Sequence, residues 1–245
     1  MILRCIGSGS SGNSYILEAS DGVLLIEAGI SFAKVKKALR FQLKRVSGCL
    51  ISHQHKDHSK YMREVIDAGI PTLALKDVFE SQGIRDGVFC KEIKPSHGYI
   101  VGGFKVFALS IAHDVPCLGF IIDHKEMGRL LFITDTMMVE YKISGLNHIM
   151  LEANYADDIL EYNIRNGITP AAMRDRLLHS HMELETVNGF LRANDLSGVS
   201  EIILIHLSGN NSDPEQFTRS VGMAAGKPVY VAKAGFEISL DAEPY

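Results

Sequence analysis

Three histidines and an aspartate occupy a stretch of six positions, namely His53, His55, Asp57 and His58. Histidine is the commonest metal ligand in proteins, and carboxylates bind hard cations. The alternative interpretation is a polar helix start that happens to be rich in histidine, and four such residues in one turn make it the weaker one. The stretch therefore predicts a metal site whose remaining ligands come from elsewhere in the chain.

Four other apolar runs also end in a side chain that can bind metal. These runs are "LLIEAG" with Glu27, "ALSIAHD" with His113, "LLFITD" with Asp135 and "IILIH" with His206. The end of a strand holds its last side chain rigidly at the edge of a sheet, where functional sites usually lie. One such residue alone is best interpreted as an ordinary polar group at the rim. Their recurrence together with the histidine-rich stretch favours a shared metal site.

The number of candidate ligands indicates more than one ion. The candidates are His53, His55, Asp57, His58, His113, Asp135 and His206. A single catalytic zinc takes about three protein ligands and a water, whereas two ions about 3.5–4 Å apart share a bridging carboxylate and hydroxide. Asp135 is the natural bridging carboxylate. We therefore predict a hydrolytic site with two divalent ions, and mixed imidazole and carboxylate ligands suit Zn²⁺ first and Mn²⁺ as an alternative.

Short apolar runs and helical periodicity predict the strands and helices that position these residues. The predicted strands cover 1–6, 14–19, 22–29, 45–53, 70–75, 88–93, 104–113, 117–124, 129–135, 147–153, 201–206, 228–232 and 236–240. The predicted helices cover 31–40, 59–69, 169–181, 183–194 and 213–225. Such a pattern predicts a layered α/β fold, with two sheets packed together and helices outside, in one domain over residues 1–245.

The composition limits the expected cellular location and binding partners of the protein. Its 245 residues are 46% hydrophobic and carry a net charge of −4. Apolar runs are too short to span a bilayer, and the N-terminus lacks the sections of a signal peptide, so we expect a cytoplasmic protein and no membrane partner. The negative net charge and the lack of a Lys/Arg-rich run count against a protein that binds long nucleic acid through its phosphates.

The motif "HQHKDH" resembles the HxHxDH signature of the metallo-β-lactamase superfamily, and His113, Asp135 and His206 follow in the order of that family. The resemblance implies a four-layer αββα sandwich. It also implies a first metal held by His53, His55 and His113, with Asp135 bridging to the second. The second metal is then held by Asp57, His58 and His206.

Four further pieces resemble the YycJ-type branch of this superfamily. They are "GSGSSGNSYIL", "LEANYADDIL", "HSHMELET" and "HLSGNN". That branch is similar to tRNase Z and other phosphodiesterases, which implies hydrolysis of phosphodiester bonds in nucleic acid by a metal-bridging hydroxide. The same layout occurs in phage anti-Pycsar enzymes, so the alternative is a phosphodiesterase that opens 3′,5′-cyclic nucleotides to monophosphates. Relatives commonly dimerise, and we expect a homodimer.

The expected chemistry and the family resemblance together indicate three catalytic residues. Asp57 orients the attacking water as well as binding metal, and His181 is the candidate general acid because imidazole titrates near neutral pH. Glu152, at the next strand end, is predicted to orient His181. Glu27 departs from the aspartate of most relatives and is expected to hold the ligand loop. The other hypotheses are a metal-binding regulator without turnover and a lactonase or thioesterase, in which His181 would be needed less.

Overall fold

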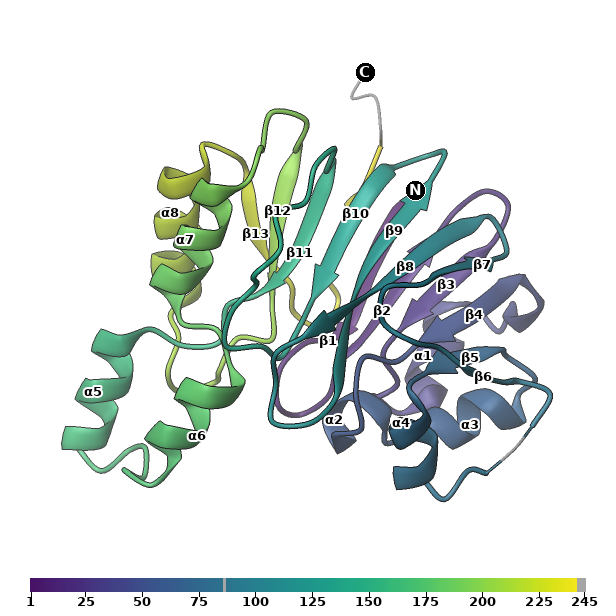
Figure 1. The fold of residues 1–245 in the computed structure, drawn as a ribbon, viewed down its shortest axis with the longest axis horizontal. Coiled ribbons are helices and arrows are strands. Elements are labelled where there is room, and N and C mark those ends of the chain that lie inside the picture. Colours follow the sequence, from purple (N-terminus) through teal and green to yellow (C-terminus); the bar gives the residue numbers. More distant parts are fainter. Residues whose placement is uncertain (86, 242–245) are drawn as a thin grey trace.

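The fold of residues 1–85 and 87–241 is described by a computed structural model, in which two β-sheets pack face to face (Figure 1). Strand pairing is mixed in both sheets. The first sheet has seven strands in the order β14 (Glu237–Ser239), β1 (Ile2–Gly7), β2 (Ser14–Glu18), β3 (Val23–Ile26), β4 (Val46–Leu50), β5 (Thr72–Ala74) and β6 (Cys90–Glu92). The second sheet also has seven, in the order β13 (Val229–Val231), β12 (Glu201–Ile205), β11 (His148–Glu152), β10 (Gly128–Ile133), β9 (Cys117–His124), β8 (Phe104–Ile111) and β7 (Gly98–Val101).

Parallel pairing brings the predicted ligands to one edge of each sheet. Strands β3 and β4 run parallel in the first sheet, and β10, β11 and β12 run parallel in the second. Strand β9 is antiparallel to both β8 and β10, so β8 points the same way as β10. The carboxyl ends of parallel strands lie at the same edge of a sheet, which is where open α/β folds place their sites.

Alternating side chains build a core on both faces of each sheet, because successive residues of a strand point to opposite faces. In β3, Leu24 and Ile26 pack between the sheets, whereas Val23 and Leu25 pack under the outer helices. In β10 the same alternation places Leu130 and Phe132 between the sheets, and Leu131 and Ile133 against the opposite outer layer. Strands that are buried on both faces read as continuous apolar runs, as the sequence shows.

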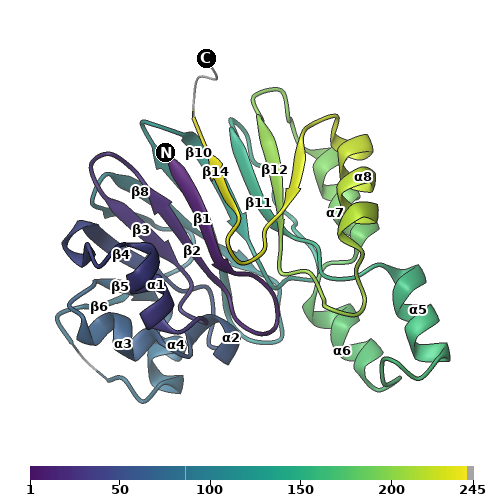
Figure 2. The same ribbon diagram turned by 180° about the vertical axis from the view of Figure 1, so that it is seen from behind.

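Helices cover the outer face of each sheet (Figures 1 and 2). On the first sheet lie α1 (Phe32–Ala38), a 3₁₀ turn (Leu43–Arg45), α2 (Lys56–Ser59), α3 (Met62–Asp67) and α4 (Lys76–Ser81). Along the second lie α7 (Leu184–Ala193) and α8 (Pro214–Ala225), and beyond them extends a pair formed by α5 (Asp157–Arg165) and α6 (Met173–Ser180). Within the described ranges, no helix is long and apolar enough to cross a membrane.

The αββα arrangement expected from the sequence is confirmed, although the helices α2, α4 and α5 and the strand β7 were not predicted. Helix α4 has only six residues, which is shorter than periodicity can reveal. Helix α5 buries Leu160 and Asn163, and Leu160 packs with Tyr155 and Leu177. Helix α6 begins four residues later than the predicted range of 169–181.

Candidate metal centre and catalytic site

Strained strand ends present the candidate ligands at the shared edge. Glu27 follows β3, Asp135 lies two residues after β10, and His206 follows β12. All three residues have positive φ angles, of 68°, 39° and 55° respectively, in the left-handed region that side chains other than glycine rarely adopt. Such conformations cost about 1–3 kcal/mol each and cluster at functional sites, where the surrounding structure enforces them.

A first group brings together His53, His55, His113 and Asp135, with one candidate ligand atom from each within 4.8 Å of the others. His53 Nε2 lies 3.8 Å from Asp135 Oδ2, and His113 Nε2 lies 4.0 Å from the same oxygen. His113 Nε2 is also 3.3 Å from His55 Nδ1. These are the residues that the family resemblance assigns to the first metal, together with the bridging carboxylate.

A second group brings together Asp57, His58, His206 and again Asp135. Asp135 Oδ1 lies 3.3 Å from His58 Nε2 and 3.6 Å from His206 Nε2. Asp57 Oδ2 lies 3.3 Å and 3.2 Å from the same two nitrogens. The two oxygens of Asp135 therefore face different groups, which is the geometry that a bridging carboxylate requires.

The nitrogen and oxygen atoms of these groups fit divalent cations. His53 is buried, and its Nε2 has no hydrogen-bond partner within the part of the chain that the structure describes. Its other nitrogen, Nδ1, lies 2.9 Å from the Ser52 hydroxyl. A buried nitrogen without a partner is costly unless something binds it. Imidazole nitrogens with carboxylates are ligands that zinc, manganese and iron accept.

A third group places Glu152 between His181 and His206. His181 Nδ1 donates a hydrogen bond to Glu152 Oε1 over 2.7 Å, and His206 Nδ1 lies 3.2 Å from the same oxygen. The other oxygen of Glu152 accepts hydrogen bonds from the backbone of Thr136 and Met182. His181 is not a solvent-facing residue, since its side chain is only 13% exposed and its ring stacks against that of His206.

Burial and neighbouring charges shift the pKa of several groups in the site. Burial lowers the pKa of His53 well below its usual value. Burial would also lower the pKa of His58 and His206, but surrounding carboxylates outweigh it; they raise that of His58 strongly and that of His206 to about 10. Burial opposes the charge on Asp135 and Asp57, yet neighbouring histidines hold the pKa of both carboxyls below the ordinary range.

His181 and Glu152 shift the pKa of one another in opposite directions. Burial alone would lower the pKa of His181, but the Glu152 carboxylate outweighs it and raises that pKa. Burial alone would raise the pKa of Glu152, but the charge and hydrogen bond of His181 outweigh burial and lower that pKa. The Glu152 carboxylate therefore favours the protonated form of the His181 imidazole.

Glu27 lies behind the second group. Its Oε2 is 3.5 Å from His58 Nδ1, and its carboxylate accepts hydrogen bonds from the backbone of Ser52 at 3.3 and 3.4 Å. Burial raises the pKa of Glu27, against the opposing charge of His58. Glu27 thus contacts one candidate ligand and the segment that carries the others, as expected for a residue that holds the ligand loop.

Several supporting residues were not singled out from the sequence. Asn13 donates its backbone N–H to the Asp57 carbonyl at 2.8 Å, and its side-chain nitrogen lies 3.0 Å from His58 Nε2. Thr134 donates to Asp135 Oδ1 at 2.6 Å. These are polar residues next to ligands in the sequence or in a glycine-rich loop, so only their spatial neighbours reveal their function.

The "GSGSSGN" loop packs against the ligand segment. A Cβ atom added at Gly29 would lie 1.6 Å from the Asp57 carbonyl oxygen, and one added at Gly12 would lie 2.6 Å from the Gly29 oxygen. Ser8 Oγ accepts a hydrogen bond from the His206 backbone N–H at 2.8 Å. Small residues therefore allow three backbone segments to meet beside the candidate ligands.

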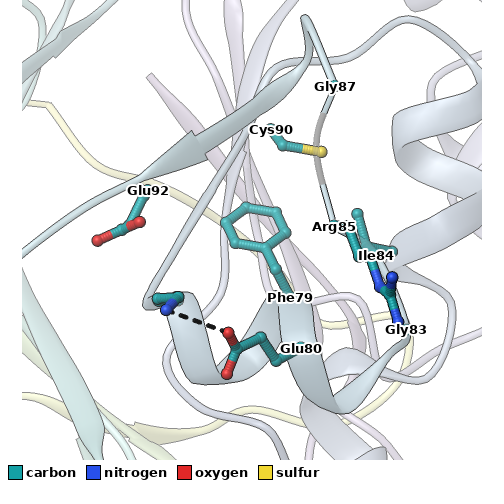
Figure 3. Close-up of a pocket in the computed structure, with 9 residues that line it drawn as sticks. Phe79, Glu80, Gly83, Ile84, Arg85, Gly87, Cys90 and Glu92 are labelled. Carbon is teal, nitrogen blue, oxygen red and sulfur yellow. Dashed lines mark ion pairs between the residues drawn. The ribbon is translucent and has the colours of Figure 1, made fainter.

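One hollow of the surface lies apart from these groups. A cavity of about 560 Å³ lies between α4 and β6, where Lys76 and Glu80 form an ion pair at 3.3 Å (Figure 3). Its lining includes the half-buried Cys90, and no histidine lines it among the described residues. The candidate metal ligands lie instead at the shared strand edge, so the size of a cavity does not locate the candidate site.

Comparison with known proteins agrees with this fold. The family model described as "Beta-lactamase superfamily domain" matches residues 23–207. The exodeoxyribonuclease YycJ of Bacillus anthracis is 27% identical, over 98% of this chain and 94% of that protein. The exodeoxyribonuclease WalJ of Streptococcus pneumoniae is also 27% identical, over 86% and 82% respectively. Among solved structures, the metallo-β-lactamase fold protein YhfI of Bacillus subtilis superposes with a TM-score of 0.77 at 18% identity, over 97% of this chain and 98% of that one.

The chain therefore belongs to the metallo-β-lactamase superfamily. It is a metal-dependent hydrolase with the fold of that family, as expected from the sequence.

Proposed function

We propose that this protein is a two-metal phosphodiesterase that hydrolyses nucleic acid, with DNA as the preferred substrate class. The observation that carries the proposal is the position of Asp135, whose two oxygens face two separate groups of histidines. The names of the two YycJ and WalJ relatives support a deoxyribonuclease.

The residues that would hold the two cations follow from the two groups. His53, His55 and His113 would hold the first cation and Asp57, His58 and His206 the second, with Asp135 shared between them. Two bound divalent cations would lower the pKa of a water between them and offset charge on a phosphate oxygen. Zn²⁺ and Mn²⁺ are the leading candidates, because both accept mixed imidazole and carboxylate ligands.

His181 would supply the proton that the leaving oxygen needs. Its Nδ1 donates to Glu152, so Nε2 is the nitrogen left for proton transfer to the substrate. The Glu152 carboxylate raises the pKa of His181, which favours the protonated imidazole that a general acid needs. Asp57 would bind the second cation through Oδ2, which lies close to His58 and His206, and would also orient the attacking water. Regulators without turnover have no need of this His181–Glu152 pair.

A second candidate substrate is a 3′,5′-cyclic nucleotide. The net charge of −4 favours it, because a long polyanion is usually bound by clustered cations. Both substrates present the same phosphodiester to the same groups, so only the extent of the substrate beyond the scissile bond separates them. The homodimer and the cytoplasmic location expected from the sequence stay predictions.

The experiment is a parallel digestion by protein loaded with Mn²⁺ or Zn²⁺. The substrates are 5′-labelled single-stranded DNA, the matching duplex, a short RNA and a panel of 3′,5′-cyclic nucleotides, with Asp57→Ala as the inactive control. We expect stepwise shortening of DNA that is absent in the control. Hydrolysis of cyclic nucleotides alone would favour the second candidate. Absence of hydrolysis of every phosphodiester tested would contradict the proposal.

A further inference from the structure

Asp114 brings a further carboxylate to the first group of histidines. Its Oδ1 lies 3.0 Å from His113 Nε2 and 3.5 Å from His55 Nε2. Asp135 Oδ2 is farther from His113 Nε2, at 4.0 Å. The carboxylate nearest to this ligand nitrogen is therefore Asp114, a residue to which the sequence analysis gave no function.

The hydrogen bonds of His113 show which of its nitrogens is available to a cation. His113 Nδ1 lies 3.0 Å from the carbonyl oxygen of Ser180. A carbonyl oxygen only accepts hydrogen bonds, so Nδ1 carries a hydrogen, and in the neutral imidazole Nε2 carries the lone pair. Nε2 and Asp114 Oδ1 are then two acceptors 3.0 Å apart, and a proton or a metal ion shared between them makes this contact favourable.

The surroundings of Asp114 leave room on the side of the site that faces solvent. Its side chain is 40% exposed, and that of His55 is 28% exposed, whereas those of His53 and Asp135 are almost fully buried. Asp114 and His113 also line a cavity of about 350 Å³, together with Leu75 and Pro95. The first group is consequently closed by Asp135 on its buried side and bordered by Asp114 on its open side.

We propose that Asp114 is an additional ligand of the first cation. This inference rests on the proposed function, which places a cation among His53, His55 and His113. With Asp114 and Asp135 the group offers three nitrogens and two carboxylates, which exceeds the four ligands of tetrahedral zinc. Extra oxygen ligands suit a cation of higher coordination number, such as Mn²⁺. Asp114 should therefore strengthen the binding of Mn²⁺ more than that of Zn²⁺.

The test compares cation binding by wild-type protein, Asp114→Asn, Asp114→Glu and the control Glu140→Gln. Glu140 is an exposed acid in the segment after Asp135 and has no ion pair among the described residues. Each protein is stripped with a chelator, checked for an unchanged melting temperature, and titrated with Mn²⁺ and Zn²⁺ by calorimetry. We expect Asp114→Asn to bind one Mn²⁺ about 10–100-fold more weakly, the range seen when groups that support a metal site are removed. Asp114→Glu should recover part of that loss, and Glu140→Gln should match wild type.

A spectroscopic measurement adds a readout that is independent of activity. In protein loaded with Co²⁺, loss of a ligand should strengthen the visible absorption, because four-coordinate Co²⁺ absorbs more than five-coordinate Co²⁺. Unchanged Mn²⁺ affinity and an unchanged Co²⁺ spectrum in Asp114→Asn would overturn this inference alone, and a raised KM in that variant would then assign Asp114 to substrate contact. Wild-type protein that binds no cation would overturn the proposed function as well.

Discussion

Glu152 Oε1 accepts a hydrogen bond from His181 Nδ1 over 2.7 Å, although 29 residues separate the two along the chain. The carboxylate is fully buried and fixed by two backbone N–H groups. It therefore has one orientation, and it fixes the orientation and the charge of the imidazole. In the proposed mechanism this contact determines the pH range over which the leaving oxygen receives its proton.

Replacing Glu152 with Gln should move the alkaline limb of the pH–rate profile. The acid must be protonated, so the rate falls as pH rises through the pKa of His181. The Glu152 carboxylate raises that pKa, and its removal should make the fall begin at a lower pH. We expect kcat to drop roughly 10–100-fold at pH 8 and less at pH 6.

The profile is measured as kcat against pH for wild type, Glu152→Gln and His181→Ala. The His181→Ala variant should lose this limb and about 10²–10⁴-fold in rate, the usual contribution of a general acid. A Glu152→Gln profile that drops uniformly without a shift would contradict the assigned pairing. Retention of full activity in His181→Ala would instead support the lactonase or thioesterase hypothesis.

Asp135→Ala should abolish turnover and lower the number of bound metals. Its oxygens face both groups of histidines, so truncation removes a ligand from each. The measurement is metal content by elemental analysis beside activity on DNA. A suitable control is Asp123→Ala, which removes an aspartate that pairs with Arg129 at 2.7 Å, outside the site. Full activity in Asp135→Ala would refute the two-metal proposal.

Cation binding should release protons and strengthen as pH rises. The carboxylates keep His58 and His206 protonated at neutral pH, and the pKa of His206 is about 10. The pKa of His53 is lowered and those of Asp57 and Asp135 are held low, so these three bring no proton to be displaced. Binding to the second group should therefore release about two protons between pH 6 and 8.

Titration calorimetry in buffers of different ionisation enthalpy measures this release directly. The observed enthalpy should depend on the buffer with a slope near two, and affinity should rise with pH over the same window. An enthalpy independent of the buffer would show that neither histidine loses a proton, and would argue against both as ligands.

Gly29→Ala should disturb the ligand segment through the backbone alone. The added methyl would lie 1.6 Å from the Asp57 carbonyl oxygen, which a folded chain relieves only by moving that segment. We expect a loss of about 1–3 kcal/mol in the free energy of unfolding, the usual cost of overpacking, and weaker metal binding.

Gly189→Ala is the matched control, because Gly189 lies within α7 and a Cβ there meets no atom within 4 Å. That change should stabilise the protein by roughly 0.5–1 kcal/mol, since alanine favours a helix interior. Chemical denaturation of both variants in the presence of a chelator separates the backbone effect from any effect of metal. Equal stability of Gly29→Ala and wild type would contradict the close packing described here.

The sequence by itself determined the layered fold and the histidine and aspartate residues at the strand ends. Both are local signals: residues that are buried on both faces of a sheet form apolar runs, and a polar side chain directly after such a run marks the rim. His53, Asp135 and His206 were recognisable for this reason, without knowledge of which strands are neighbours. Helix α5 was not predicted, although its Leu160 packs with Tyr155 and Leu177 in the structure.

The tertiary structure alone decided which of these residues meet and in what geometry. Strand order places β10 and β12 on either side of β11, so Asp135, Glu152 and His206 share one edge. The two oxygens of Asp135, the shared oxygen of Glu152 and the approach of Asp114 to His55 depend on distances across sheets and loops. Sequence spacing carries no information about such contacts, because they arise when distant segments pack against a common edge.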